Sequence, residues 1–190
     1  MFICPTRGRP DKLQRLIDAC VDTDMTSPVI CYVDDDDYKL TQYVFLQRPK
    51  GWNLEVRPRR TLWQIYEDHF KEYRNSSYYG FLGDDLIPRT KRWDQILIEE
   101  AGNSGVSYGD DLLQGRRLCT HPVVAGDLAR RLGWLVYPGL NADTAWYVAA
   151  QELGVLRYRP DVILEHMHWI NGKAEFDETY DVDPAAMKAD

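Results

Sequence analysis

Short apolar runs alternate with apolar residues at helical spacing along the first half of the chain. The runs predict buried strands at residues 2–4, 29–33, 54–56 and 78–82. Apolar side chains three and four residues apart predict helices at 13–21, over about 38–46, at 62–73 and at 93–97. Thr61 and Thr90 are the expected N-caps of the last two helices. This alternation predicts an α/β fold in which helices cover a mostly parallel sheet.

The second half of the chain has a less regular pattern. Short strands are predicted at residues 106–108, 123–125, 155–158 and 162–164. A short helix is expected around 128–132 and a longer one over 143–153, with Gly154 as its C-cap. The chain becomes polar and acidic from Asn171 onward. We therefore expect one compact domain over residues 1–175 and a polar, acidic tail over 176–190.

Composition narrows the class of protein. No apolar run approaches the roughly 20 residues of a membrane span, and the first residues do not have the pattern of a signal peptide. The four cysteines form no C-x-x-C pair, and Cys20 and Cys31 fall on apolar stripes, as core residues in a reducing compartment do. We expect a cytoplasmic protein without a membrane span, of a size that suits a phage or a small bacterial gene cluster.

Net charge adds one exclusion and one open question. A charge of −7 argues against a general nucleic-acid binder. A basic, aromatic cluster nevertheless occurs at Trp52, Arg57, Arg59, Arg60 and Trp63. It could receive a flipped or single-stranded base, or form a solvated charged face, as most charge runs do.

Acidic residues follow three of the predicted strands. They lie at 34–37, at Asp84-Asp85 and at Asp110-Asp111. Carboxyl ends of parallel strands share one edge of a sheet, where ligands bind, and paired carboxylates suit a hard divalent cation that also holds phosphates. The string 108–111 matches the metal-binding hairpin of RNA-dependent RNA polymerases, but the chain is too short for that fold. Asp110 or Asp111 can still lie at the edge that receives an acceptor.

The turn after the first strand, residues 5–10, supplies Arg7 and Arg9 for phosphate and Gly8 for close backbone approach. It matches neither the phosphate-binding loop of ATPases nor the dinucleotide-binding fingerprint. The order of residues 4–10, then Val33-Asp34-Asp35, then 81–85 resembles a GT-A glycosyltransferase of the family 2 type. The resemblance covers about residues 1–170 and implies a Rossmann-like, mostly parallel central sheet flanked by helices in a single domain.

The resemblance also implies roles for individual residues. Nucleotide-sugar binding falls to Pro5, Thr6, Arg7, Arg9, Asp34, Asp35 and Asp84. In this family the first turn holds the base, an acid after the second strand contacts the nucleoside, and the acidic pair binds ribose and metal. Asp84 would then face ribose, and Asp85 would bind Mn²⁺ or Mg²⁺. The acidic pair here has no intervening residue, unlike the usual DXD motif.

Four later positions extend the resemblance. Asp143, at the start of a predicted helix, matches the family's catalytic base, because a helix N-terminus keeps a carboxylate ionised; a plain N-cap is the alternative. His166 and His168 project to one side of an extended segment and match the late histidine that ligates metal; ordinary loop histidines are the alternative. Lys173 would pair with the diphosphate leaving group.

Two further residues, His121 and Trp134, are either acceptor contacts or core packing, with packing favoured for Trp134. The resemblance thus implies a metal-dependent glycosyltransferase that moves a sugar from a nucleotide-diphosphate donor to an acceptor hydroxyl. It would invert the anomeric configuration, with Asp143 as the general base. The acceptor could be a glycan, a lipid-linked sugar, a protein or a modified DNA base. The alternatives are a nucleotidyltransferase-like enzyme and a non-catalytic sugar-nucleotide-binding module.

Overall fold

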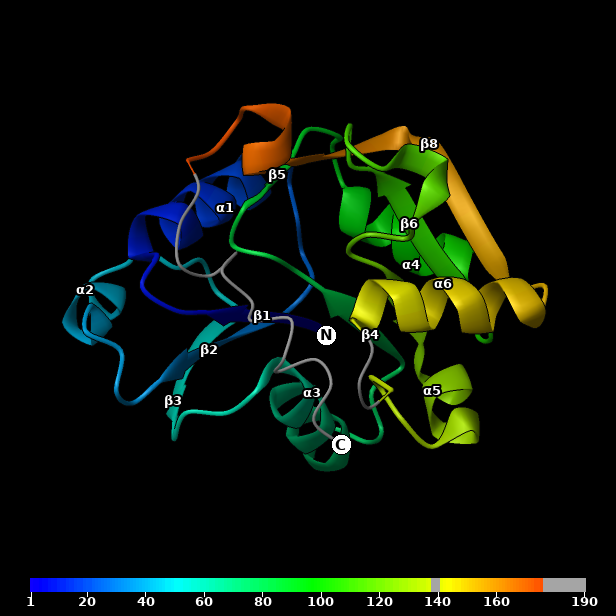
Figure 1. Ribbon diagram of the computed structural model, residues 1–190, viewed down its shortest axis with the longest axis horizontal. Helices are drawn as coiled ribbons and strands as arrows, with labels where there is room; N and C mark the ends of the chain where they lie inside the picture. Colours follow the sequence, from blue (N-terminus) through cyan, green and yellow to red (C-terminus); the bar gives the residue numbers. More distant parts are fainter. Residues whose placement is uncertain (138–140, 176–190) are drawn as a thin grey trace.

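The computed structural model describes residues 1–137 and 141–175, so the predicted acidic tail over 176–190 lies outside the described residues. One eight-stranded sheet has the order β3-β2-β1-β4-β7-β6-β8-β5 (Figure 1). The strands are β1 (Phe2–Thr6), β2 (Val29–Asp34), β3 (Trp52–Arg57), β4 (Tyr78–Phe81), β5 (Leu86–Pro88), β6 (Val106–Asp110), β7 (Val123–Ala125) and β8 (Leu156–His166).

Strand direction agrees with the predicted α/β fold. The pairs β1–β2, β2–β3, β1–β4 and β6–β8 are parallel. Antiparallel pairs join β7 to β4 and β6, and β5 to β8. Within the described part of the chain, only β5 and β7 therefore run against the other six strands, and the prediction of a mostly parallel sheet is confirmed.

The helices of the described residues are α1 (Pro10–Asp22), α2 (Leu40–Val44), α3 (Leu62–Glu72), α4 (Trp93–Ala101), α5 (Gly126–Leu132) and α6 (Ala142–Glu152). Short 3₁₀ turns occur at Gly115–Arg117 and Trp169–Asn171. Pro10 opens α1, where its missing N–H costs nothing. Thr61 and Gln64 form a capping box at α3, so the predicted Thr61 cap is confirmed.

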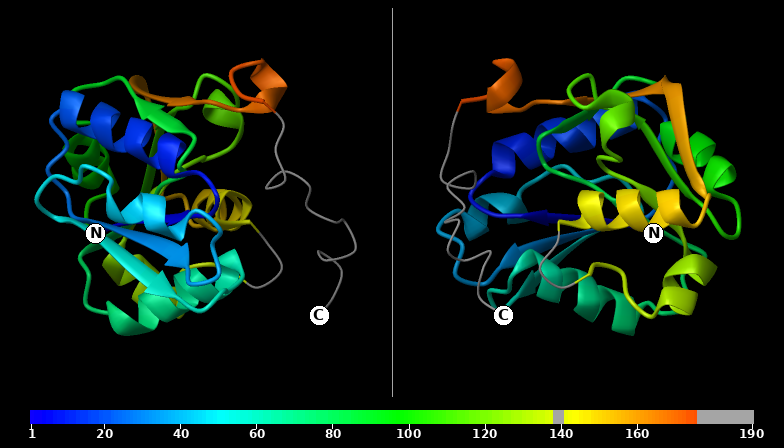
Figure 2. Two further views of the ribbon diagram at one scale, coloured as in Figure 1. Left: turned by 90° about the vertical axis from the view of Figure 1, so that its left-hand side faces the viewer. Right: turned by 45° about the vertical axis from the view of Figure 1, so that its right-hand side comes forward.

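Both faces of the sheet are buried. Alternate residues of β1 and β2 point to opposite sides, so Phe2 and Cys31 pack with α1 and α4, whereas Ile3 and Tyr32 pack on the side of α3, α5 and α6. Figure 2 shows these two helical layers on either side of the sheet. Cys20 lies in the first core, and all four cysteines are buried and free. Two-sided burial explains why these strands read as continuous apolar runs.

Several predicted boundaries were wrong. Thr90 does not cap α4: its hydroxyl donates to the Asp161 carbonyl at 3.2 Å and accepts from the Ile163 N–H at 2.8 Å, which ties it to β8. Helix α4 starts instead at Trp93, after Arg92 in a left-handed conformation. The helix expected over 38–46 is limited to Leu40–Val44, and β3 is longer than the predicted 54–56.

The two strands predicted at 155–158 and 162–164 form one strand, β8. Its first part pairs with β6 and its last part with β5. Pro160 lies where the register with β6 shifts, which suits a residue without an N–H. The short β5 was not predicted, because a three-residue run after a turn carries no periodicity. Among the described helices, none has the length and apolar content to cross a membrane.

Candidate functional site

A cleft lies at the carboxyl ends of β1, β2 and β4. The strand order reverses between β1 and β4, which is where ligands bind in open α/β sheets. The cleft has a volume of about 410 Å³. Its lining includes Pro5, Thr6, Arg7, Arg9, Asp34, Arg59, Arg60, Asp84 and Asp85. The structure thus brings together most residues assigned to nucleotide-sugar binding. Asp35 is exposed and is absent from this lining.

A smaller pocket of about 150 Å³ adjoins the cleft. The two cavities share Tyr32, Asp34, Arg60 and Ile65 in their linings. The residues of the basic, aromatic cluster noted in the sequence therefore lie in different surroundings. Arg59 and Arg60 face the cleft, while Arg57 forms ion pairs with Glu55 and Glu72 and stacks 4.6 Å from the centre of the Tyr32 ring. Trp52 is buried in the core.

Asp84 joins the first turn to the end of β4. Thr6 Oγ1 donates to its Oδ2 at 2.7 Å, and an Arg9 guanidinium N–H donates to its Oδ1 at 3.1 Å. The side chain of Asp84 is buried, and burial raises its pKa to about 6, although Arg9 and Thr6 favour the ionised form. Both oxygens of Asp84 therefore fix the turn after β1 against the end of β4, where the cleft lies.

The turn after β1 is also held by the acidic run after β2. Arg7 pairs with Asp34 at 2.9 Å and with Asp36 at 2.5 Å. The Gly8 N–H donates to Asp37 Oδ2 at 2.7 Å, and Gly8 has a φ of +68°, which favours glycine. The run of four acids thus serves partly to fix the turn.

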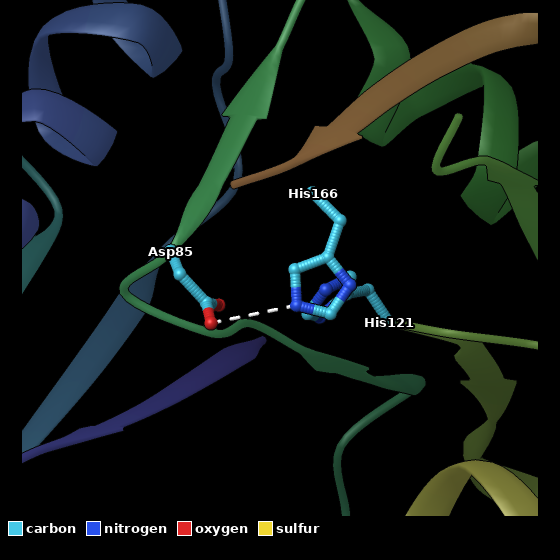
Figure 3. Close-up of side chains that lie close together, drawn as sticks. All are labelled: Asp85, His121 and His166. Carbon is cyan, nitrogen blue, oxygen red and sulfur yellow. Dashed lines mark ion pairs between the residues drawn. The ribbon is translucent and has the colours of Figure 1, made fainter. Parts of the chain in front are cut away.

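Asp85 belongs to a second group of side chains. Figure 3 shows Asp85, His121 and His166 close together; one ligand atom from each lies within 4.8 Å of the other two, so the three side chains could hold a metal ion. His166 Nε2 lies 3.4 Å from Asp85 Oδ2. Glycine at position 83 leaves room for this group, because a Cβ there would lie 2.5 Å from Asp85 Oδ1 and 3.1 Å from His121 Cε1. These three side chains come from three separate segments of the chain.

The sheet explains how the three segments meet. Asp85 follows β4, and His166 ends β8. His121 precedes β7, which is antiparallel to β4, so the start of β7 lies beside the end of β4. The Met167 N–H donates to the Asp85 carbonyl at 2.8 Å and fixes the end of β8 against the turn. The long-range register of the sheet therefore builds this group.

His121 was not predicted as a possible metal ligand. Its Nε2 is buried without a hydrogen-bond partner, and its backbone φ is +51°, an uncommon value for histidine. Its ring centre lies 5.2 Å from that of His166. No sequence motif predicts that His121 lies beside Asp85, because this depends on the antiparallel pairing of β7 with β4.

Electrostatics differ within the group. Burial alone would raise the pKa of Asp85. The hydrogen bond and the charge of His166 have a larger, opposite effect and hold that pKa well below its usual range. Burial likewise opposes charge on His166, and its two carboxylate neighbours, Asp111 and Asp85, raise its pKa to about 9. Burial lowers the pKa of His121 to about 4, so this imidazole is neutral and able to bind a cation.

The other late residues lie nearby with different contacts. His168 is not part of the three-residue group found in the described residues; its Nδ1 accepts from the Ile170 N–H at 3.2 Å, and its ring centre lies 5.1 Å from that of His166. Lys173 pairs with Glu165 at 2.6 Å.

Trp134 packs against Trp146, with ring centres 4.5 Å apart, which agrees with the packing role favoured for it.

Asp143 lies in the first turn of α6, and Asn141 occupies the N-cap, so the N-cap alternative for Asp143 is wrong. Burial raises the pKa of Asp143 to about 6; the charge of His166 opposes this rise, and the charges of Asp111 and Asp85 add to it. These influences place Asp143 within electrostatic range of the acid and histidine group. A partly buried carboxylate of this kind can exchange a proton near neutral pH.

Comparison with known proteins supports the fold. No protein-family model and no curated protein sequence matches the chain. Similar solved structures include a mannosyltransferase from Pyrobaculum calidifontis in complex with GDP-Man and Mn²⁺, at a TM-score of 0.65 and 11% identity, which covers 88% of this chain and 56% of that one. The TarS structure from S. aureus has a TM-score of 0.63 and 14% identity, and covers 86% of this chain and 58% of that one.

A third structure comes from Desulfovibrio desulfuricans G20 and is described as a nucleotide-diphospho-sugar transferase. Its TM-score is 0.56 at 7% identity, over 84% of this chain and 78% of that one. The chain spans a little over half the length of the first two structures. The resemblance expected from the order of the sequence motifs is thus confirmed at the level of architecture: the chain has the GT-A fold found in nucleotide-diphospho-sugar transferases.

Proposed function

We propose that this chain is a metal-dependent glycosyltransferase that moves a sugar from a nucleotide-diphosphate donor to an acceptor hydroxyl with inversion. One observation carries the proposal: Asp85, His121 and His166 gather beside the cleft, at the switch point of a GT-A fold. A carboxylate alone is a common surface feature. A carboxylate with two partly buried imidazoles beside a cleft has the chemical groups and the location of a reaction centre.

The donor would occupy the two adjoining cavities. The smaller pocket suits the base, and Asp34, which lines both cavities, would contact the nucleoside. Arg7, Arg59 and Arg60 line the cleft and would compensate the charge of the diphosphate. Asp84 would act next to the ribose, held in place by Thr6 and Arg9. Lys173 remains a candidate for the leaving diphosphate.

The residues fit a divalent cation. His121 Nε2 has no partner, and the ligand atoms of Asp85, His121 and His166 lie close enough to share one ion. Two imidazoles favour Mn²⁺ over Mg²⁺, which prefers oxygen ligands. When bound, the cation would stabilise the negative charge of the departing diphosphate. His168, whose ring centre lies 5.1 Å from that of His166, would be a further ligand.

Asp143 would act on the acceptor. Its carboxylate takes the proton from the acceptor hydroxyl, whose oxygen forms a bond to the anomeric carbon as the bond from that carbon to the diphosphate oxygen breaks. Attack from the face opposite the leaving group inverts the configuration. A pKa of about 6 keeps most of the Asp143 carboxylate ionised at neutral pH, while leaving it basic enough to accept a proton.

The test uses the whole chain with UDP-, GDP- and TDP-sugars in turn, with Mn²⁺ and with EDTA. We expect release of the nucleoside diphosphate from at least one donor, lost in EDTA and in Asp85→Asn. Asp127→Asn serves as the control, because Asp127 is an exposed carboxylate on α5 that pairs with Arg130. Release of pyrophosphate would indicate a nucleotidyltransferase instead. Tight donor binding without turnover in the presence of acceptor mixtures would indicate a binding module.

A further inference from the structure

Asp111, which follows β6, is a buried carboxylate with its two oxygens in different surroundings. Its side chain is 1% exposed. Oδ1 accepts backbone N–H bonds from Leu113, Gln114 and Gly115 at 3.0, 2.6 and 2.9 Å. Oδ2 is buried and has no hydrogen-bond partner. Three donors fix the orientation of the carboxylate, so Oδ2 points in a set direction.

Asp111 Oδ2 points toward the imidazole of His166. The backbone N–H of His166 donates to the backbone carbonyl of Asp111 at 3.0 Å, so the main chain holds the two residues next to each other. His166 Nδ1 lies 3.7 Å from Asp111 Oδ2, too far for a hydrogen bond, and neither atom has another partner. The other ring nitrogen, Nε2, lies 3.4 Å from Asp85. The imidazole of His166 therefore stands between two carboxylates, one for each nitrogen.

We propose that Asp111 is a positioning residue that holds the proton of His166 on Nδ1 and so leaves Nε2 as the ligand atom. This inference rests on the proposed function, in which His166 ligates the cation. A histidine that binds metal through one nitrogen commonly donates its other N–H to a carboxylate, which fixes the tautomer and ring orientation. A movement of under about 1 Å would bring Nδ1 and Oδ2 to normal hydrogen-bond distance and satisfy two buried polar atoms at once.

The neighbouring acid provides a matched control. Asp110 Oδ1 accepts from the Leu112 N–H at 2.9 Å, and its carboxylate interacts with Tyr158 rather than with His166. Asp110, the last residue of β6, and Asp111 are thus adjacent carboxylates that accept the same type of local hydrogen bond. Only Asp111 faces the imidazole.

Asp111→Asn tests the proposal sharply. The three backbone donors require an oxygen at the Oδ1 position, so the amide NH₂ must replace Oδ2 and face Nδ1. A donor there favours the proton on Nε2, the nitrogen that the cation needs. Titration of the protein with Mn²⁺ alone, followed by the EPR signal of free Mn²⁺, should show affinity weakened by roughly 10- to 100-fold. Asp110→Asn should stay within about threefold of wild type.

A double-mutant cycle separates positioning from a structural role. In a His166→Ala background, Asp111→Asn should cause no further loss of Mn²⁺ affinity, because the group that it positions is gone. Thermal melting of each variant checks the fold. A further loss in the His166→Ala background would overturn the proposal and indicate that Asp111 is itself a ligand or supports the loop.

A measurement on the unaltered protein covers the case in which Asp111→Asn does not fold. With ¹⁵N-labelled histidine and Zn²⁺ as a diamagnetic probe ion, NMR should place the His166 proton on Nδ1. A proton on Nε2 would overturn the proposal. Wild-type protein that binds no cation, with or without a nucleoside diphosphate, would instead remove the proposed metal-dependent function. Unchanged affinity in Asp111→Asn, beside normal binding in wild type, would refute the positioning role alone.

Discussion

Asp84 and Asp85 are adjacent in the chain but belong to two contrasting regions. On the side of the proposed donor site, called the donor side below, Asp84 accepts hydrogen bonds from Thr6 and Arg9, and hydrogen bonds tie the turn after β1 to Asp34 and Asp37. On the side of the proposed cation site, called the metal side below, Asp85 lies beside His121 and His166. Hydrogen bonds link the side chains of the donor side to one another, whereas three buried polar atoms of the metal side lie close together without hydrogen-bond partners.

The difference lies in how many buried polar atoms lack hydrogen-bond partners. On the metal side, these atoms are His121 Nε2, which faces the proposed cation site, and the pair His166 Nδ1 and Asp111 Oδ2, which face each other. A buried polar atom in this state costs about 1–3 kcal/mol. The left-handed backbone at His121 adds a further cost of about 1–3 kcal/mol. Such costs gathered in one place suggest a site shaped for a ligand, while the donor side is shaped mainly for rigidity.

The largest expected effect is the loss of activity in Asp85→Asn, which should differ from the effect of Asp84→Asn. Asp85→Asn should lower transfer by on the order of a thousandfold, because loss of the cation removes several kcal/mol of transition-state stabilisation. Asp84→Asn should mainly raise KM for the donor, since the amide can still accept from Thr6. Steady-state kinetics at one Mn²⁺ concentration, chosen to saturate the wild type, measures both. Equal loss of kcat in the two variants would remove the distinction between the regions.

Asp143→Asn should lower kcat by about a hundredfold or more and leave donor affinity unchanged. In wild type, kcat/KM should fall about tenfold per unit as pH drops below about 6, because the base becomes protonated below its pKa. This fall should be shallower in the variant, in which Asp84, whose pKa burial also raises to about 6, still titrates.

A pH–rate profile of both proteins, with NMR of the product anomer, provides the check on Asp143. Activity above about a tenth of wild type would deny the residue a catalytic role. Retained configuration in the product would contradict the inverting mechanism.

His121→Asn probes the metal side alone. Asparagine tolerates a positive φ better than most residues, so the backbone should keep its shape. Affinity for Mn²⁺ should fall roughly 10- to 100-fold, in the range that disturbed metal sites show. The melting temperature should stay near that of wild type. Calorimetric titration with Mn²⁺ checks this, and unchanged affinity would make His121 a packing residue.

The smallest effect is expected on the donor side. Thr6→Val keeps the shape of the side chain but removes the hydroxyl that donates to Asp84, at a cost of about 1 kcal/mol in the free energy of unfolding. Donor KM should rise a few-fold at most. Thr6→Ser retains the hydroxyl and is the control. Denaturant unfolding measures the stability of both, and a fall with serine as large as that with valine would show that the methyl group matters instead.

Local patterns predicted much of the donor side. The apolar runs at 2–4 and 29–33, the helical stripe at 13–21 and the capped α3 are short-range signals. Their alternation indicated that the first strands run parallel, as they do. Acids directly after β2 and β4 had to lie at one sheet edge, so the position of Asp34, Asp84 and Asp85 followed. The prediction that Thr90 caps α4 was wrong, because its hydroxyl forms a hydrogen bond with the distant strand β8 instead of with the nearby helix.

Sequence by itself thus determined the α/β class, the sheet edge at which the cleft lies and the position of the acids at the ends of β2 and β4, because these depend on periodicity and strand direction. Only the tertiary structure decided that β7 runs antiparallel beside β4, that β8 is one strand and that Asp111 faces His166. The register between distant strands brings His121, His166 and Asp111 to Asp85. Register arises from the packing of whole surfaces, which no local pattern encodes.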